Sequence, residues 1–176
     1  MATKLIQISG KPDAASVNSV HLNFNSAVAN PIITGITNPA DLGAVGFGGC
    51  ARACSVTGAA GWDGGDVTLN GLDIRGNAVS ELFKVVDIAG FTKPGVQVFA
   101  KVLSITHSLV GAGVLLASVG VGDKLGFAQG GPCFGPAVIF VTGVGELPAA
   151  LDHTYQSVTP TSVPNAAKTY LLLIGE

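Results

Sequence analysis

The stretch DVTLNGLDIRGNAVSELFKVV (residues 66–86), continued by VQVFAKVLSITH (96–107) and VLLASVGVGDKLG (114–126), determines the fold that we predict. Short runs rich in Val, Ile, Leu and Phe alternate with Gly, Asn and Asp. This pattern is typical of antiparallel strands joined by tight turns, and it leaves no room for long helices. We therefore predict an all-β protein, an antiparallel β-sandwich of the jelly-roll kind with long irregular loops and little helix.

Details within this stretch follow from the same pattern. Residues 79–88 and 96–107 each read as one long strand, because apolar residues continue along them. Residues 70–71 (Asn-Gly), 73–77 and 122–124 (Gly-Asp-Lys) are predicted to be turns, since these residue types adopt turn conformations readily.

Outside the central stretch, the pattern predicts further strands at residues 4–8, 17–24, 32–36, 50–56, 137–142 and 167–175. Residues 147–164 hold three prolines and read as irregular. We expect residues 1–13 to form an N-terminal arm or a first strand, and residues 14–176 to form a single β-sandwich domain.

The composition points to contacts with other chains. Of the 176 residues, 48% are hydrophobic and only 11% are charged, against about 25% charged in a typical soluble domain. A surface with so few charges is expected to be partly buried against other chains, the alternative being a monomer coated with Ser, Thr, Asn and Gly. The net charge is −2 with scattered Lys and Arg, so we expect no nucleic-acid partner.

Two segments bear on targeting and on membranes. The N-terminal residues 1–13 lack an uninterrupted apolar run and do not resemble a secretory signal. Residues 102–122 are almost free of ionisable groups, but their Val, Ile and Gly content favours two strands with a turn around residues 109–113 over a membrane helix. We expect no membrane partner.

Neither a cofactor nor an enzyme activity is predicted. The cysteines, Cys50, Cys54 and Cys133, are expected to be reduced thiols that pack as small hydrophobic side chains. A zinc site would need a further ligand, and no histidine lies at a characteristic spacing. The Gly-rich run at residues 120–126 lacks the Gly-Lys-Ser/Thr ending of a phosphate-binding loop. No nucleophile, base and orienting residue can be grouped from the sequence.

Four motifs resemble a known family. They are ITNP (residues 36–39), GDVTLNGLDIRGNAVSE (65–81), KVLSIT (101–106) and VGVGDKLGF (119–127). In this order they resemble small structural proteins of tailed bacteriophages. The match covers about half of the chain. The loop at residues 126–136 and the tail beyond residue 147 depart from it.

This resemblance implies a virion component, a capsid-associated or head-decoration protein. Such proteins are commonly β-rich, are often trimers and lie on the outside of the capsid. The implied partners are the major capsid protein and further copies of the chain itself. The implied location is the capsid surface, after synthesis in the host cytoplasm. The resemblance carries over no catalytic residue, because the motifs look like determinants of turns and strands.

The candidate interface residues are Trp62, Lys4, Leu5 and Ile6. Trp62 follows a Gly-rich turn, where a single tryptophan serves either as a core residue or as an interface anchor. Lys4, Leu5 and Ile6 belong to the N-terminal arm, which has the alternation needed to add as a strand to a neighbouring molecule.

Two alternatives from other classes are kept. A tail or fibre-associated β-sandwich that binds host glycans would use Trp62, Tyr155 and Tyr170 as stacking groups. A metalloenzyme on a jelly-roll scaffold would need His21, His107 and His153 to converge with a carboxylate.

Overall fold

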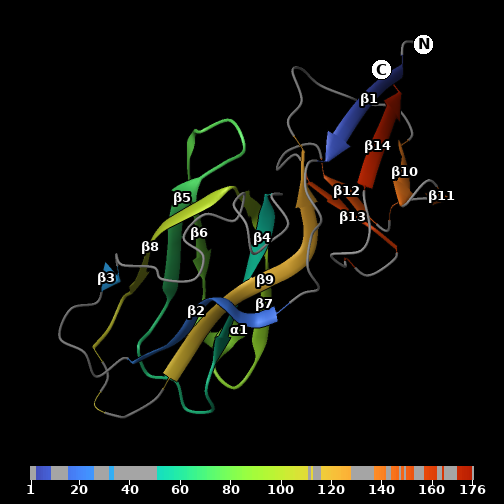
Figure 1. The fold of residues 1–176 in the computed structure, drawn as a ribbon. Helices are drawn as coiled ribbons and strands as arrows, with labels where there is room; N and C mark the ends of the chain where they lie inside the picture. Colours follow the sequence, from blue (N-terminus) through green and yellow to red (C-terminus); the bar gives the residue numbers. More distant parts are fainter. Residues whose placement is uncertain are drawn as a thin grey trace.

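The structure is a computed structural model that describes residues 3–8, 16–25, 32–33, 51–110, 112, 116–127, 137–141, 144–146, 148, 150–152, 157–161, 164 and 170–175. Over these residues the chain is built of strands with one short helix (Figure 1). In chain order the elements are β1 (Thr3–Ile8), β2 (Ser16–Asn25), β3 (Ile32–Ile33), β4 (Arg52–Gly58), β5 (Val67–Leu72), β6 (Ala78–Phe83), α1 (Val85–Ile88), β7 (Thr92–Phe99), β8 (Lys101–His107), β9 (Leu116–Gly126), β10 (Ala137–Val141), β11 (Val144–Glu146), β12 (Ala150–Asp152), β13 (Ser157–Thr159) and β14 (Tyr170–Gly175).

The described strands form three sheets with antiparallel pairing. One sheet has the order β3-β8-β5-β6. A second has the order β12-β13-β9-β4-β7, and β2 also pairs with β9. The third has the order β1-β14-β10-β11. Neighbours in sequence such as β7 and β8 therefore belong to different sheets, as expected when a chain is wound around a common core.

The first two sheets pack face to face. Along β5, Val67 and Leu69 are buried while Thr68 and Asn70 are half-buried, which is the alternation of a strand with one face on the core. These inward residues join Phe24 of β2 and other buried residues of β4, β7, β8 and β9 in one hydrophobic cluster, called here the first core. The predicted all-β antiparallel sandwich is confirmed. The jelly-roll topology stays a prediction.

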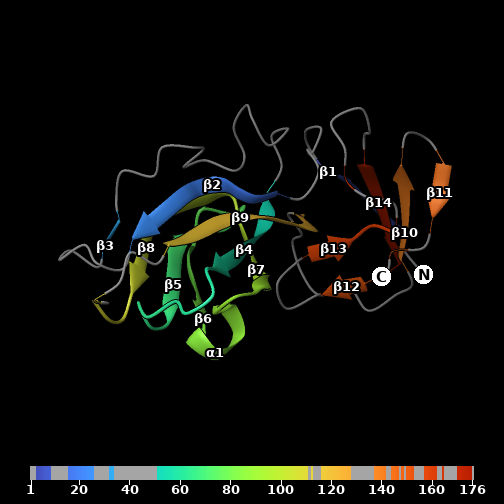
Figure 2. The ribbon, with the colours of Figure 1, turned by 90° about the horizontal axis from the view of Figure 1, so that it is seen from below.

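A second core lies under the β1-β14-β10-β11 sheet. It is formed by Leu125, Phe127, Val141, Val158, Tyr170 and Leu172. Strand β9 contributes to both cores, and Figure 2 shows it running from the part that contains β2 and β8 toward the part that contains β13 and β14. The division into an arm (residues 1–13) and one domain (residues 14–176) stays a prediction.

Two long strands that the sequence suggested are each divided by a crossing between sheets. Residues 79–88 are not one strand, because β6 ends at Phe83 and α1 carries the chain from one sheet to the other. Residues 96–107 are also not one strand. The chain leaves the second sheet with β7, bends at Ala100, whose N–H donates to the carbonyl oxygen of Leu72, and joins the first sheet as β8.

Two turns that the sequence suggested lie inside strands. Residues 70–71 belong to β5, where the pairing register with β8 shifts. Residues 122–124 belong to β9, where the register with β4 shifts between Arg52 and Cys54. Residues 122–124 of β9 lie opposite Ala53 alone, so the extra residues are on β9. At residues 70–71 the extra residue is instead Leu103 of β8. Such β-bulges bend a strand without reversing it. Residues 73–77, by contrast, do form the turn between β5 and β6.

The C-terminal third holds more strands than the prolines suggested. Within residues 147–164, described above as irregular, the short strands β12 and β13 pair with each other. Proline is tolerated there because it lies outside the paired residues, at Pro148, Pro160 and Pro164.

Candidate interaction surfaces

The N-terminal candidates lie on an edge strand. Lys4, Leu5 and Ile6 are in β1, where they pair with Ile174, Leu173 and Leu172 of β14. The partner of this strand is thus the chain's own C-terminal strand. Among the described strands none pairs with the second edge of β1. Strand addition to a neighbouring molecule through that second edge stays a prediction.

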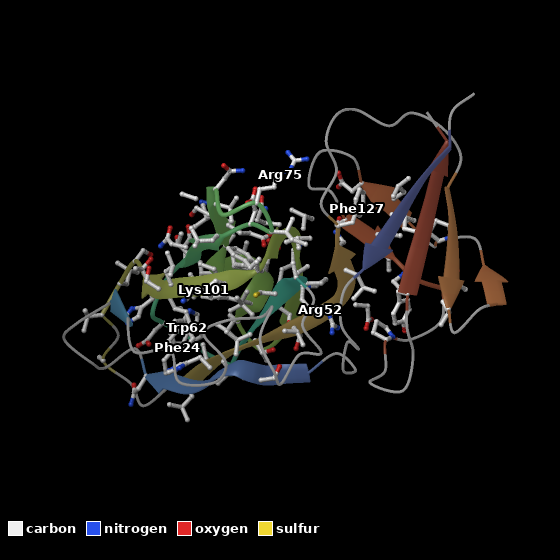
Figure 3. The ribbon with its side chains drawn as sticks, turned by 45° about the horizontal axis from the view of Figure 1, so that its top comes forward. Phe24, Arg52, Trp62, Arg75, Lys101 and Phe127 are labelled. Atoms are coloured by element: carbon white, nitrogen blue, oxygen red, sulfur yellow. The ribbon has the colours of Figure 1, made fainter. Side chains whose placement is uncertain are left out.

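Of the two roles considered for Trp62, core residue or interface anchor, the structure shows the core position. Its side chain is only 4% exposed. The ring contacts Phe24 edge-on, with centroids 5.5 Å apart, and His107, with centroids 6.0 Å apart. The indole Nε1 donates to the carbonyl oxygen of Gly65 at 2.8 Å. Figure 3 shows Trp62 and Phe24 side by side next to β2. The ring therefore anchors the loop at residues 59–66 to the first core and is not offered to a partner.

The histidines do not form a described metal site. His21 and His107 lie 6.1 Å and 6.3 Å from the Phe24 ring, measured between centroids. Burial lowers the pKa of His21, which favours its neutral form. Within the ranges that the structure covers, no three His, Cys, Asp or Glu residues are grouped to hold a metal ion. His153 lies outside the described residues.

Other candidates from the sequence are buried or lie outside the described residues. Cys54 is a free, buried thiol, and burial raises its pKa well above the ordinary value, so it packs as a hydrophobic residue. Cys50 and Cys133 are outside the described residues. Of the two tyrosines proposed as glycan-stacking groups, Tyr170 is buried in the second core and Tyr155 is outside the described residues.

Three loops meet at one end of the first core, and Asp66 joins them. We call this region, made of residues 58–66, 84–91 and 108–110, the loop end. The carboxylate of Asp66 accepts hydrogen bonds from the backbone N–H of Val85 at 2.8 Å and from Lys84 Nζ at 3.0 Å. Its backbone N–H donates to Ser108 Oγ, and its carbonyl oxygen accepts from the Ser108 N–H. The bonds from Val85 and Lys84 to the carboxylate lower the pKa of Asp66, mainly through Val85.

The loop end carries exposed apolar side chains that the sequence analysis did not single out. Val86 is 80% exposed and Phe91 is 67% exposed. Leu109 and Val110, on the neighbouring loop, are more than half exposed. The signal in the sequence was a run of apolar residues after Glu81, which we took as a strand. The structure shows that these side chains point outward because residues 84–91 leave the sheet.

Glu81 joins the edges of the two packed sheets. From β6 its carboxylate accepts hydrogen bonds from the backbone N–H groups of Val96, at 2.6 Å, and Gln97, at 3.3 Å, on β7. Burial raises the pKa of Glu81, while these two bonds and the charge of Lys124 oppose the rise. A side chain thus provides hydrogen bonds at a seam where two strands do not pair.

Comparisons with known proteins add no relative. No protein-family model matches the chain, and neither curated proteins nor solved structures give a significant match. None of the helices among the described residues is long and apolar enough to cross a bilayer.

Proposed function

We propose that the chain is a decoration protein of a tailed bacteriophage head. It binds the outside of the capsid as a homo-oligomer, a trimer by its resemblance, and stabilises contacts between major capsid subunits. The observation that carries this proposal is the set of four motifs at residues 36–39, 65–81, 101–106 and 119–127, in the order found in that family. Virion localisation and the absence of an enzyme activity belong to the same proposal.

The described motif residues perform structural tasks, which supports a resemblance at the level of the framework. Within residues 65–81, the Asp73 carboxylate accepts from the backbone N–H groups of Arg75 and Asn77 and thereby fixes the β5–β6 turn. Within residues 119–127, Gly126 packs so closely against Ala51 and Val98 that no Cβ fits. Structural roles of this kind would account for a resemblance that carries over no catalytic group.

The physical action would be mechanical. A rigid β framework with apolar loops and few charges can bury surface against protein neighbours at a small desolvation cost. On a closed shell the same modest contact is repeated at many equivalent positions, and copies joined in an oligomer bind with added avidity. Bridging adjacent capsid subunits would then resist expansion driven by packaged DNA.

The test is binding of the purified chain to undecorated capsids. We expect saturable binding at symmetry-related positions in a cryo-EM map, together with release of packaged DNA at a higher temperature than from undecorated heads. Absence of saturable, symmetric binding would remove the proposal. The alternative of a glycan-binding tail or fibre protein predicts signal on a glycan array, whereas a decoration protein gives none.

A further inference from the structure

The loop end is the most apolar exposed part of the described surface. Seven large hydrophobic side chains are more than 40% exposed among the described residues, and four of them, Val86, Phe91, Leu109 and Val110, lie on its loops. Figure 2 places α1, which carries Val86, at the margin of the molecule beside β6 and β7. Exposed apolar residues that gather on adjacent loops indicate a contact surface, whereas scattered ones need no explanation.

Hydrogen bonds fix the backbone of the loops that carry these side chains. Gly90 has a φ of 79°, a left-handed conformation that suits glycine, and its N–H donates to the carbonyl oxygens of Gly58 and Ala59. The N–H of Phe91 donates to the carbonyl oxygen of Ile88. Asp66 fixes the start of α1 through Val85. The backbone of this surface is therefore fixed before binding, which lowers the backbone entropy lost on binding.

The charges around this surface are balanced. Lys93 Nζ lies 3.5 Å from the Asp87 carboxylate, and Lys84 Nζ lies 3.0 Å from that of Asp66. Such a surface has no basic field to attract nucleic acid or anionic lipid. A second copy of the chain offers matching chemistry, because it brings apolar side chains to apolar side chains and a Lys–Asp pair to a Lys–Asp pair.

We propose that copies of this chain associate with one another through the loop end. Val86 and Phe91 lie in the contact, and Lys93 of one copy faces Asp87 of the next. Rotational symmetry brings identical patches together, so the apolar contact and the Lys93–Asp87 pairing between copies can form at the same time. The inference rests on the homo-oligomer that the proposed function expects, and it names the surface that joins the copies. It does not require the capsid to be present.

The first test is sedimentation velocity of the full chain over a range of concentrations. We expect the unchanged chain to sediment as an oligomer. The double variant Val86→Ser/Phe91→Ser should weaken association by on the order of 10- to 100-fold, because it removes two apolar side chains from the contact. The control is Leu103→Ser, which changes another exposed apolar side chain, 48% exposed in the middle of β8, and should leave the oligomer intact.

The second test reverses the charges. Lys93→Asp and Asp87→Lys should each weaken association, since each leaves like charges facing each other between copies. The double variant Asp87→Lys/Lys93→Asp restores opposite charges in every copy and should recover association. Both residues are about half exposed, so none of these variants should unfold the chain, which thermal unfolding would verify.

Three results would overturn the inference. One is a chain that stays monomeric at every concentration. Another is an oligomer that Val86→Ser/Phe91→Ser leaves intact, because the copies would then associate through a different surface. The last is a monomer whose binding to capsids is weakened by the same substitutions, which would assign the loop end to the capsid instead. In that case the proposed capsid-binding function would stand and the inference would fail. If the chain instead forms an oligomer through the loop end but does not bind capsids, the inference would stand and the proposed function would fail.

Discussion

The guanidinium group of Arg52 on β4 donates hydrogen bonds from Nε and Nη2 to the carbonyl oxygen of Gly122 on β9, with an Nε–O distance of 3.1 Å. Arg52 is fully buried. Gly122 begins the bulge at which β9 passes from the first core toward the second. A guanidinium group presents several N–H donors and a positive charge. It can therefore form hydrogen bonds with a backbone carbonyl oxygen that has no partner in the β-sheet at a bulge.

Replacing Arg52 is therefore expected to be costly. Arg52→Met removes the donors and leaves the Gly122 carbonyl without these bonds, so we expect a loss of about 2 to 4 kcal/mol in the free energy of unfolding. Urea unfolding of the unchanged chain and of Arg52→Met measures this difference in the free energy of unfolding. The control is Arg75→Met at the exposed β5–β6 turn, where Figure 3 shows the side chain pointing away from the body. Equal effects of the two substitutions would contradict a structural role for the Arg52 bond.

Glu81 should make stability fall as the pH rises. Burial raises its pKa above the ordinary value of 4.5, so between 4.5 and the folded-state pKa the folded chain binds more protons than the unfolded chain. The contribution of Glu81 to the free energy of unfolding is thus most favourable below this window and decreases as the pH rises through it. The charge of Lys124 on β9 acts on Glu81, and the buried Cys54 on β4 is an ionisable group close enough to interact with Glu81.

The measurement is the difference in unfolding free energy between the unchanged chain and Glu81→Gln at several pH values between 4 and 7. We expect this difference to decrease as the pH rises, since Gln does not titrate. A difference that is constant or increases would show that the hydrogen bonds from Val96 and Gln97 outweigh the burial of the carboxylate.

Asp66 should have the opposite dependence. Its pKa is lowered from the ordinary value of 3.8, chiefly by the hydrogen bond from Val85, so its stabilising effect is present above that value and is lost as the pH falls through the folded-state pKa. Asp66→Ala should accelerate amide hydrogen exchange at Val85, because that N–H loses its acceptor. Asp123→Ala, at an exposed carboxylate of β9, is the control and should leave exchange at Val85 unchanged.

Two glycines of β9 should respond differently to the same change. A Cβ at Gly126 would collide with Val98 Cγ1 and lie 2.9 Å from Ala51 Cβ, so Gly126→Ala should destabilise the chain by about 1 to 3 kcal/mol. A Cβ at Gly122 meets only Ala53 O at 3.6 Å, so Gly122→Ala should be nearly neutral. Thermal unfolding of both variants tests this. A larger loss of stability for Gly122→Ala than for Gly126→Ala would show that the side chains around Gly126 move to accommodate the added Cβ.

Much of the fold can be read from local pattern. Alternation in β2 and β5, and the turn at residues 73–77, are properties of a few consecutive residues, and they predict an all-β chain correctly. The interior position of Trp62 was one of two alternatives because a sequence shows a large aromatic residue but not which side of its loop faces the core.

The candidate surfaces were less accessible to sequence reasoning. Lys4, Leu5 and Ile6 were predicted to lie on an arm or a first strand, and they lie on strand β1, whose partner β14 is at the other end of the chain. The exposed Val86 belongs to the run at residues 79–88 that was predicted to be a strand, and Phe91 follows that run. Only the crossing from β6 to β7 turns these side chains outward.

The sequence by itself determined the kind of secondary structure, because the period-2 pattern and the turn residues act over a few neighbours. Only the tertiary structure decided where strands bend, cross or continue. Gly122-Asp123-Lys124 has the composition of a turn, yet it forms a bulge because Arg52 and Cys54 on β4 hold the residues on either side in register. Whether such a segment reverses or bends depends on hydrogen-bond partners that are distant in the chain, and local composition does not specify them.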